Sequence, residues 1–537
     1  MMQTMGSENP PPRPESAASS RSGNSGRSYL WPALISAAVA FAAYAITLHG
    51  TLVYDDLILR IDPRYASPSL WKNFWVDQYW PGGIDNLYRP LSCMTLAVQY
   101  WLHGELAWPY HLVNILLHAS VSAAVAEFAR RLLSLRAAWI AGLLFAVHPI
   151  HVEVVAGIVG RLELLSTLFT LIALCIYLRP MSCRRIIMIG VLFLAAAFSK
   201  EQGLLVPPMI LALTPYRKKK LSSTSENLEG DKRHLRQLAG ILLLLLGGYL
   251  IFRESILRFW WPRSLMYWGT NPLLRSTGLD RMLMPLVLLG KYTQLLIAPV
   301  HLSVDYGSMV FGWKVNYHQP YFYIGIAAAI ASLVVLIITL RRRNWPLFFL
   351  LISLGLSYAM VGNIVTIIGT NLAERLMYMP SAFFLMIIAA YAARLRTALL
   401  APAVAVLVAL GAVRTVTYAR LWNDPLALYL NNLKHTPRSL KLYDLVLEQY
   451  EQRGDMQAAK ALGHRCIENV PDVWDAYALC IEVDLKTEDY DDAAAVAALG
   501  MKNDPNLQMQ LWQKKVANAR RNAGLPTSAP AASPARQ

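Results

Sequence analysis

The amino-acid sequence predicts an all-α protein that crosses a membrane about eleven times and carries a short helical repeat domain at its C-terminus. Of its 537 residues, 55% are hydrophobic and only 16% are charged, whereas soluble globular proteins carry about 25% charged residues. Apolar runs long enough to cross a bilayer recur along most of the chain. Because backbone groups in lipid must be hydrogen-bonded within their own segment, we expect these runs to be helices. The clearest are Leu30–Leu48, Ala137–Ala156, Leu164–Tyr177, Leu238–Phe252, Tyr321–Leu340, Leu347–Gly362, Leu376–Ala392 and Leu399–Val416.

Residues 1–28 are rich in Ser, Pro, Gly and Arg, which predicts a disordered tail. The first apolar run is long, and no small-residue cleavage site clearly ends it, so we interpret it as a span and not as a cleaved signal. Three arginines precede this run. Because positive charge marks cytoplasmic segments, the N-terminus is expected to lie in the cytoplasm.

Basic residues cluster at the ends of the apolar runs, as is typical of cytoplasmic loops. With the N-terminus inside, this pattern places the loop of residues 50–90 outside. If Met282–Val300 crossed the membrane, Arg341–Arg343 would lie outside. We therefore expect that segment, which contains Lys291 and Pro299, to be re-entrant or interfacial. The transmembrane domain then covers residues 29–420, and the C-terminus lies outside. The net charge of +16 favours anionic lipids as partners over nucleic acid, because no compact soluble basic domain is present.

Residues 421–519 are polar and helical, and they contain a repeat with an offset of 34 residues. Asp455, Ala459 and Pro471 recur as Asp489, Ala493 and Pro505. The small alanine lets two helices approach and the proline ends the second one, which is typical of tetratricopeptide repeats. Such a domain offers a surface for a protein partner. Residues 520–537 are rich in Ala, Pro and Ser and predict a second disordered tail.

The five cysteines form no Cys-x-x-Cys pair, so zinc and redox motifs of that kind are unsupported. Cys466 and Cys480 both lie in the repeat domain. We interpret them as packed thiols, with a disulfide as the alternative in an outward-facing domain.

Two adjacent carboxylates, Asp55 and Asp56, follow the first apolar run directly. In most loops such a pair is a helix cap or a solvated turn. Here the following loop is rich in aromatic residues, which is typical of a segment at the membrane interface. Carboxylates held against such a low-dielectric surface can act as general bases with a raised pKa. The pair is therefore the leading candidate for chemistry, with a slight preference for Asp56 as the base.

A second polar group, His148, His151 and Glu153, lies at the end of another span. Polar residues at membrane depth are costly, and they indicate a functional site. The three side chains could bind zinc if they converged, although His-x-x-His is a weak motif. Alternatively, Pro149 bends the helix, and the imidazoles bond to the carbonyls that the bend frees. A third hypothesis makes this segment an acidic wall of the site.

Opposite charges also stand side by side at two span boundaries. An interfacial salt bridge and a phosphate-binding role are about equally supported for such pairs. Arg375 suits a phosphate better than Lys200, because its fork can bind two oxygens. No P-loop, dinucleotide fingerprint or nucleophile elbow is present, so nucleotide chemistry is unsupported. The two pairs are Lys200 with Glu201 and Glu374 with Arg375. Arg161 and Glu163 belong instead to the acidic wall around His148–Glu153, where Arg161 could pair with a lipid phosphate.

An ordered series of motifs identifies a family. The motifs are Tyr54–Asp56, Tyr88–Leu91, Tyr110–Asn114, His148–Glu153, Gly160-Arg161, Lys200–Gly203, Ala373–Ser381 and Trp422–Asp424. Together they resemble the transmembrane and tetratricopeptide-repeat O-mannosyltransferases. The resemblance covers roughly residues 30–510 and lies in the order of the motifs, since each alone is weak.

The resemblance implies a GT-C fold and an enzyme that moves a sugar, mannose or another hexose, from a polyprenyl-phosphate carrier to a hydroxyl of an exported protein or glycan. It implies that Asp55 and Asp56 are catalytic. Positive charge for the leaving phosphate could come from Arg89, Arg161, Arg375 or Lys200. The supporting or acceptor-side residues would be His148, His151, Glu153, Glu163, Glu201 and Glu374.

No cofactor is required by this scheme, although a divalent cation could bridge the Asp pair and Glu153 or Glu163. The composition and short repeat array favour a bacterial inner-membrane protein with its site and C-terminal domain outside. The alternative function is a non-catalytic scaffold that recruits proteins through its repeats. A lipid flippase is a weaker alternative, because the charges lie at the outer boundary and not deep in the spans.

Overall fold

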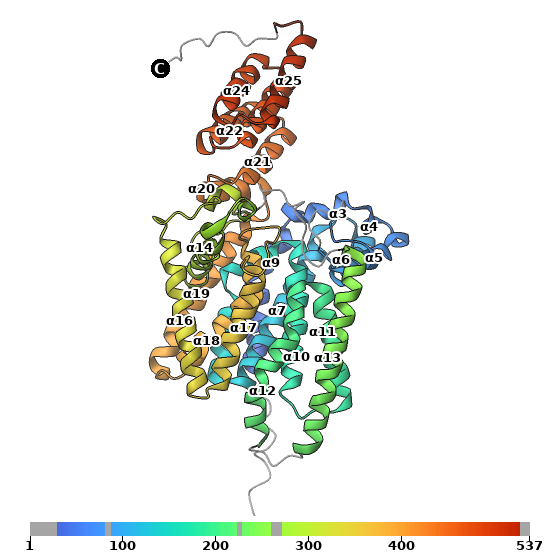
Figure 1. The fold of residues 1–537 in the computed structure, drawn as a ribbon. Coiled ribbons are helices and arrows are strands. Elements are labelled where there is room, and N and C mark those ends of the chain that lie inside the picture. Colours follow the sequence, from blue (N-terminus) through green and yellow to red (C-terminus); the bar gives the residue numbers. More distant parts are fainter. Residues whose placement is uncertain (1–28, 81–86, 223–227, 259–270, 527–537) are drawn as a thin grey trace, which may run out of the picture.

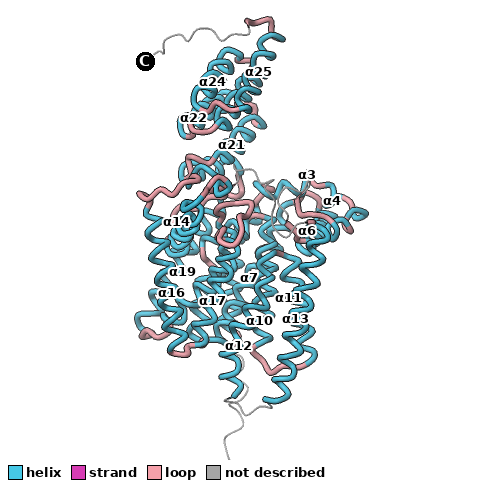
Figure 2. The backbone as a smooth tube through the Cα atoms, in the orientation of Figure 1, coloured by secondary structure: helices cyan, strands magenta, loops and turns pink. Residues whose placement is uncertain are grey.

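The computed structural model describes residues 29–80, 87–222, 228–258 and 271–526. Throughout these residues the regular structure is helical, without a strand (Figure 2). The all-α prediction is therefore confirmed. The expected tail of residues 1–28 and most of the expected C-terminal tail lie outside the described residues.

A bundle of long helices forms the body of the molecule (Figure 1). Among the described residues, seven helices are long and apolar enough to cross a membrane, or eight if a bent pair counts as one span. The remaining expected spans correspond to α11, α12 and α17, each 17 residues long, which is near the lower limit for a span. The bundle comprises α2 (Trp31–Tyr44), α7 (Ala107–Leu132), α8 (Leu135–Ala146), α10 (Arg161–Tyr177), α11 (Cys183–Ser199), α12 (Val206–Ser222), α13 (Leu228–Leu257), α16 (Pro320–Arg341), α17 (Trp345–Val361), α18 (Tyr378–Ala392) and α19 (Thr397–Leu421).

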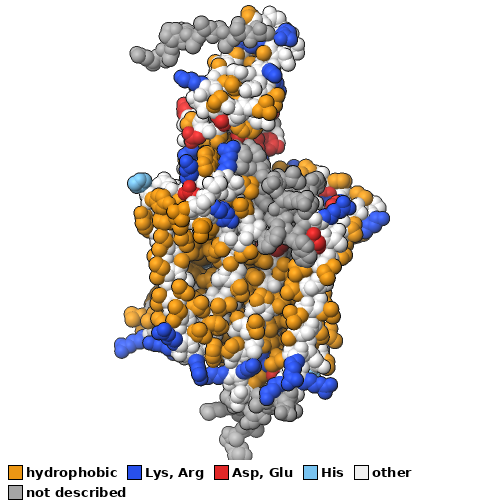
Figure 3. All heavy atoms as spheres, viewed as in Figure 1, with side chains coloured by type: hydrophobic (Ala, Val, Ile, Leu, Met, Phe, Trp, Pro, Cys, Tyr) orange, Lys and Arg blue, Asp and Glu red, His pale blue; other side chains and the backbone are white. Residues whose placement is uncertain are grey.

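Apolar side chains cover the visible flank of the bundle, and lysines and arginines gather at the end opposite the C-terminal domain (Figure 3). A helix surface of this kind would be unstable in water but suits lipid. The chain is thus a polytopic integral membrane protein. The end of the bundle that faces the C-terminal domain is called the upper end below, as it is oriented in Figure 1.

The loop after the first span folds into short helices with a core of its own at the upper end. Tyr65, Phe74 and Leu96 are buried together. The Arg64 guanidinium pairs with Asp62 at 2.7 Å and also donates to two loop carbonyls. Part of the aromatic content expected at the membrane interface therefore forms a local core instead. The elements are η2 (Tyr54–Leu57), α3 (Ile58–Ile61), α4 (Pro63–Ala66), η3 (Pro68–Leu70), α5 (Asn73–Val76) and α6 (Pro90–His103).

Helix α14 (Gly278–Ile297) lies towards the upper end and packs on α16 (Figure 1). It is 20 residues long but is not among the helices apolar enough to span. Its expected re-entrant or interfacial position stays a prediction. The two helices cross closely because Gly290 faces Tyr321 and Gly325 faces Leu286. Two short elements flank α14: η7 (Pro272–Leu274) and α15 (Ser308–Phe311).

The C-terminal domain consists of paired helices that stand on the upper end (Figure 1). Asp455 and Asp489 cap α22 and α24 by accepting from backbone amides, which explains why the repeat conserves an aspartate there. Its core is continuous with that of the membrane domain. Helix α25 ends at Asn522, inside the segment where we expect a disordered tail. The helices are α20 (Pro425–His435), α21 (Leu440–Gln452), α22 (Met456–Asn469), α23 (Trp474–Lys486), α24 (Tyr490–Asn503) and α25 (Leu507–Asn522).

We expect Gly290→Ala to destabilise the protein by about 1–3 kcal/mol, the usual cost of overpacking. A Cβ at this position would lie 1.8 Å from the Tyr321 carbonyl oxygen, so α14 and α16 must separate. Thermal unfolding in detergent measures the effect. Gly355→Ala in α17 is the matched control, because a Cβ there meets nothing within 4 Å. Equal melting temperatures for the two variants would contradict the prediction.

Candidate active site

Three charged side chains from distant segments meet at the upper end of the bundle. Arg375, in η8 (Glu374–Met377), places Nη2 3.2 Å from the Asp55 carboxylate in η2. Its Nη1 pairs with Glu153, in α9 (Val152–Ala156). The Arg375 backbone N–H also donates to Glu153 at 2.7 Å. Two carboxylates therefore share one guanidinium, and we call these three residues the acid–arginine cluster.

The cluster is accessible on one side only. The side chains of Asp55 and Arg375 are 27% and 23% exposed, whereas that of Glu153 is 3% exposed. Glu153 therefore holds the guanidinium from behind. Asp55 and the free edge of Arg375 can meet a molecule that arrives from outside the bundle.

Asp56 faces the opposite way from its neighbour. It is 1% exposed, and its carboxylate accepts from the backbone N–H of Val53 at 3.3 Å and of Val159 at 3.0 Å. Burial raises the pKa of Asp56 to about 7, although the backbone amides lower it. Asp56 thus ties the loop to η5 (Ile158–Gly160) at the start of the next span.

Residues from the second half of the chain also hold the loop that carries both aspartates. The backbone of Tyr54 has φ +59°, a conformation that residues other than glycine rarely adopt. Its backbone N–H donates to the Tyr429 hydroxyl at 3.1 Å, and its own hydroxyl donates to Asp305 at 3.4 Å. Asp305 accepts in turn from Ser439, which caps α21. Sequence reasoning missed Asp305, Tyr429 and Ser439, because nothing in their local context links them to a loop more than 200 residues away.

A second set of charges lies beside the cluster and is paired within the protein. Arg89 contacts Glu201, at the start of η6 (Glu201–Leu205), at 2.8 Å. Lys200 pairs with Glu163, and both are almost fully buried. Although burial alone would raise it, Arg89 holds the pKa of Glu201 below its ordinary value. Glu163 also interacts electrostatically with Arg89 and Arg375. The charges of the two sets therefore influence one another.

Two other predicted residues lie away from the cluster. Arg161 is 1% exposed and donates to Asn114 at 3.1 Å and to two backbone carbonyls. Glu374 points away from Arg375 and accepts from the Ser303 N–H and the Tyr306 hydroxyl, both at 2.7 Å. Its partners Ser303 and Tyr306 line a cavity of about 150 Å³ together with Lys291.

The two predicted histidines hold helices together and do not converge with Glu153 on a metal. His151 bonds to the Phe145 carbonyl at 3.0 Å and to the Ser381 hydroxyl at 2.8 Å. His148, just before η4 (Pro149–His151), contacts the Leu296 carbonyl at 3.0 Å. The bend at Pro149 frees the Phe145 carbonyl, which His151 satisfies, whereas His148 bonds to a carbonyl of α14. These contacts favour the structural alternative over the zinc hypothesis for this segment.

Comparison with known proteins finds sequence similarity to protein mannosyltransferases. Residues 90–228 match the model of the dolichyl-phosphate-mannose-protein mannosyltransferases. A protein O-mannosyl-transferase of Caenorhabditis elegans is 26% identical over 433 residues, which cover 76% of this chain and 58% of that protein. Another, of Mus musculus, is 29% identical over 330 residues, which cover 55% and 38%. A third, of Drosophila melanogaster, is 32% identical over 295 residues, which cover 51% and 30%.

The chain thus spans less than two thirds of the length of these relatives. Among solved structures, the oligosaccharyltransferase of Archaeoglobus fulgidus in its apo form is 14% identical, with a TM-score of 0.40 over 78% of this chain and 59% of that chain. The family match and the relatives confirm the resemblance to protein O-mannosyl-transferases that the ordered motifs predict.

We expect Asp56 to make the stability of the protein fall as pH rises towards 7. The carboxyl pKa is about 3.9 in an unfolded chain and about 7 in the folded protein. Between these values the folded state keeps a proton that the unfolded chain has lost. The contribution is complete below about pH 3.9 and is lost as pH rises through about 7.

Melting temperatures of the wild type and Asp56→Asn in detergent, from pH 5 to pH 8, test this expectation. The wild type should lose stability relative to the variant as pH rises. Asp77→Asn is the control, because Asp77 lies in the same loop with a side chain that is 63% exposed. A difference between wild type and Asp56→Asn that is constant with pH would contradict the expected linkage.

Proposed function

We propose that the protein is a membrane glycosyltransferase that moves mannose, or another hexose, from a polyprenyl-phosphate carrier to a hydroxyl of an exported protein or glycan. The observation that carries the proposal is the contact between Asp55 and Arg375 on the open side of the acid–arginine cluster. This contact joins a carboxylate and a guanidinium, the two kinds of group that the proposed reaction needs, at the end of a membrane bundle. The similarity to protein O-mannosyl-transferases favours this reaction class.

The reaction needs a base for the acceptor hydroxyl and a positive group for the leaving phosphate. The acceptor hydroxyl oxygen bonds to the anomeric carbon while the bond from that carbon to the phosphate oxygen breaks. A carboxylate takes the hydroxyl proton. The leaving phosphate keeps the electron pair, and a guanidinium stabilises its charge. A single displacement of this kind inverts the anomeric centre.

The geometry favours Asp55 over Asp56 as the base. Asp55 is partly exposed and bonds only to a side chain that a substrate can displace. Asp56 is buried, and its oxygens point at backbone amides, so an acceptor hydroxyl cannot reach them without opening the loop. In this scheme Asp56 is a positioning residue for Asp55.

Donor binding would prepare the base. A phosphate that approaches the exposed edge of Arg375 competes with Asp55 for Nη2, while Glu153 keeps its hold on Nη1. The released Asp55 carboxylate can then accept a proton from the acceptor. Arg375 also fills the space between Asp55 and Glu153 that a bridging divalent cation would need, so the scheme assigns the positive charge to the guanidinium.

The other predicted cations have weaker claims on the phosphate. Arg89 and Lys200 would first have to leave Glu201 and Glu163. Arg161 is enclosed by the protein. In this scheme Arg89 and Lys200 contribute positive electrostatic potential near the leaving phosphate. Arg161 positions the loop through its hydrogen bond to Asn114.

We expect Asp55→Asn to lower transfer by about 10²–10⁴-fold, the usual worth of a general base. Membranes are supplied with radiolabelled polyprenyl-phosphate mannose, and label in protein is counted. Asp77→Asn, an exposed acid of the same loop, should transfer at the wild-type rate. Unchanged transfer by Asp55→Asn would overturn the proposal. A loss of function on deletion of residues 437–537, with the aspartate variants active, would identify a scaffold instead.

We expect Arg375→Gln to lower kcat/KM for the donor by about 10²–10³-fold, as for other groups that stabilise transition-state charge. Arg375→Lys should recover only part of this, because a lysine binds as a point charge and cannot form a fork. Steady-state rates over a range of donor concentrations measure the effect. An unchanged donor dependence in both variants would exclude Arg375 from phosphate binding.

A further inference from the structure

The C-terminal domain buries a carboxylate that its own contacts do not satisfy. Asp484 in α23 is 0% exposed, and its Oδ1 has no hydrogen-bond partner. Its Oδ2 accepts from the Cys480 thiol at 3.8 Å. The Lys460 ammonium is 3.9 Å from Oδ1 and is closer to Asp489 and Asp492. An ionised carboxylate in such a place is costly unless a cation offsets it.

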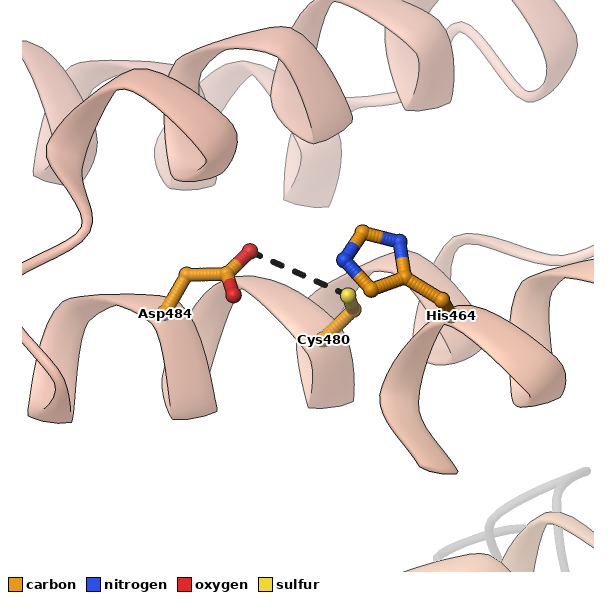
Figure 4. Close-up of side chains that lie close together, drawn as sticks. All are labelled: His464, Cys480 and Asp484. Carbon is orange, nitrogen blue, oxygen red and sulfur yellow. Dashed lines mark hydrogen bonds between the residues drawn. The ribbon is translucent and has the colours of Figure 1, made fainter. Parts of the chain in front are cut away.

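Two further ligand groups lie next to this carboxylate. His464 in α22 and Cys480 in α23 each bring a ligand atom within 4.8 Å of the others and of Asp484. Figure 4 shows the Cys480 sulfur facing the carboxylate of Asp484 and lying beside the imidazole of His464. Cys480 and Asp484 are four residues apart, so they share one face of α23.

The repeat itself does not call for these residues. At the offset of 34, Cys480 corresponds to Val446, Asp484 to Tyr450, and His464 to Ala498. Each of the three positions therefore holds an aliphatic or aromatic side chain in the repeat that does not contribute to the cluster there. Helix packing needs no carboxylate, thiol or imidazole there, and the three polar groups occur together only where α22 meets α23.

We propose that His464, Cys480 and Asp484 bind one zinc ion that joins the two repeats. Nitrogen, sulfur and oxygen ligands suit zinc, and tetrahedral geometry would bring the ligand atoms to about 3.5 Å from one another, which small side-chain rotations can reach. Binding releases the thiol proton and offsets the buried carboxylate. A water would complete the four ligands that zinc prefers.

The site requires nothing of the proposed sugar transfer, so each can fail without the other. Its role is to clamp α22 to α23. Two repeats are fewer than the roughly three usually needed for a stable array, and a bound ion adds stability because it binds only the folded form. Cys-x-x-Cys spacing does not reveal this set, because it contains one cysteine and because His464 comes from the neighbouring helix.

Cobalt(II) titration of the purified full-length protein tests the proposal. The protein is treated with a chelator in detergent with a phosphine reductant, and Co²⁺ is added. We expect one ion per chain and a near-ultraviolet absorption from thiolate to Co²⁺. Zn²⁺ should abolish the band by displacement and should raise the melting temperature. Absence of the band and of any zinc-dependent shift would overturn the proposal.

Variants locate the ion. Cys480→Ser should remove the band, and His464→Ala and Asp484→Asn should each weaken zinc binding by more than about 100-fold, beyond the effect of losing an outer-shell partner. Cys183→Ser is the control, because this exposed thiol also lies next to an imidazole, 3.8 Å from His234. If Cys480→Ser does not fold, His464→Ala decides, since His464 lies at the surface. A band that survives in Cys480→Ser, or disappears in Cys183→Ser, would overturn the proposal.

Discussion

A charged side chain within a membrane bundle needs an opposite charge or several hydrogen bonds, because neither lipid nor the apolar core can solvate it. This constraint shapes the whole upper end of the molecule. Arg375 lies between Asp55 and Glu153, Lys200 pairs with Glu163, and Arg89 pairs with Glu201. The contact of Arg375 with Asp55 is the most exposed of these pairs, with side chains 23% and 27% exposed against 14% and 20% for Arg89 and Glu201, so it is the place where a charged substrate can most readily exchange for a protein partner.

The acidic loop depends on this arrangement and on the C-terminal domain together. Tyr54 keeps an unfavourable backbone conformation that the surrounding contacts must hold. The contacts with Tyr429 and with Asp305 provide that hold, and Ser439 at the start of α21 extends it into the C-terminal domain. The domain is thus mechanically connected to the loop that presents Asp55, in addition to any partner that it binds.

The C-terminal domain gains stability from more than one source. Its core continues into the membrane domain through residues such as Tyr429 and Leu442. Further from the membrane, the interface of α22 and α23 contains the proposed zinc ligands. A short array therefore rests on the bundle at one end and is joined across its repeats by a metal clamp.

Local patterns in the sequence determined the helical fold, the order of the elements and the repeat, because apolar periodicity and capping residues act over a few positions. The ordered motifs also brought Asp55, Glu153 and Arg375 into one candidate set. Only the tertiary structure decided which members meet. Asp55 and Asp56 are neighbours of equal chemistry, yet one faces the open side and the other faces backbone amides. Arg161 and Arg375 likewise differ only in what surrounds them. Burial and pairing depend on segments that lie far apart in the chain, by 103 residues for Asp56 and Val159 and by 222 for Arg375 and Glu153, and no local pattern contains that information.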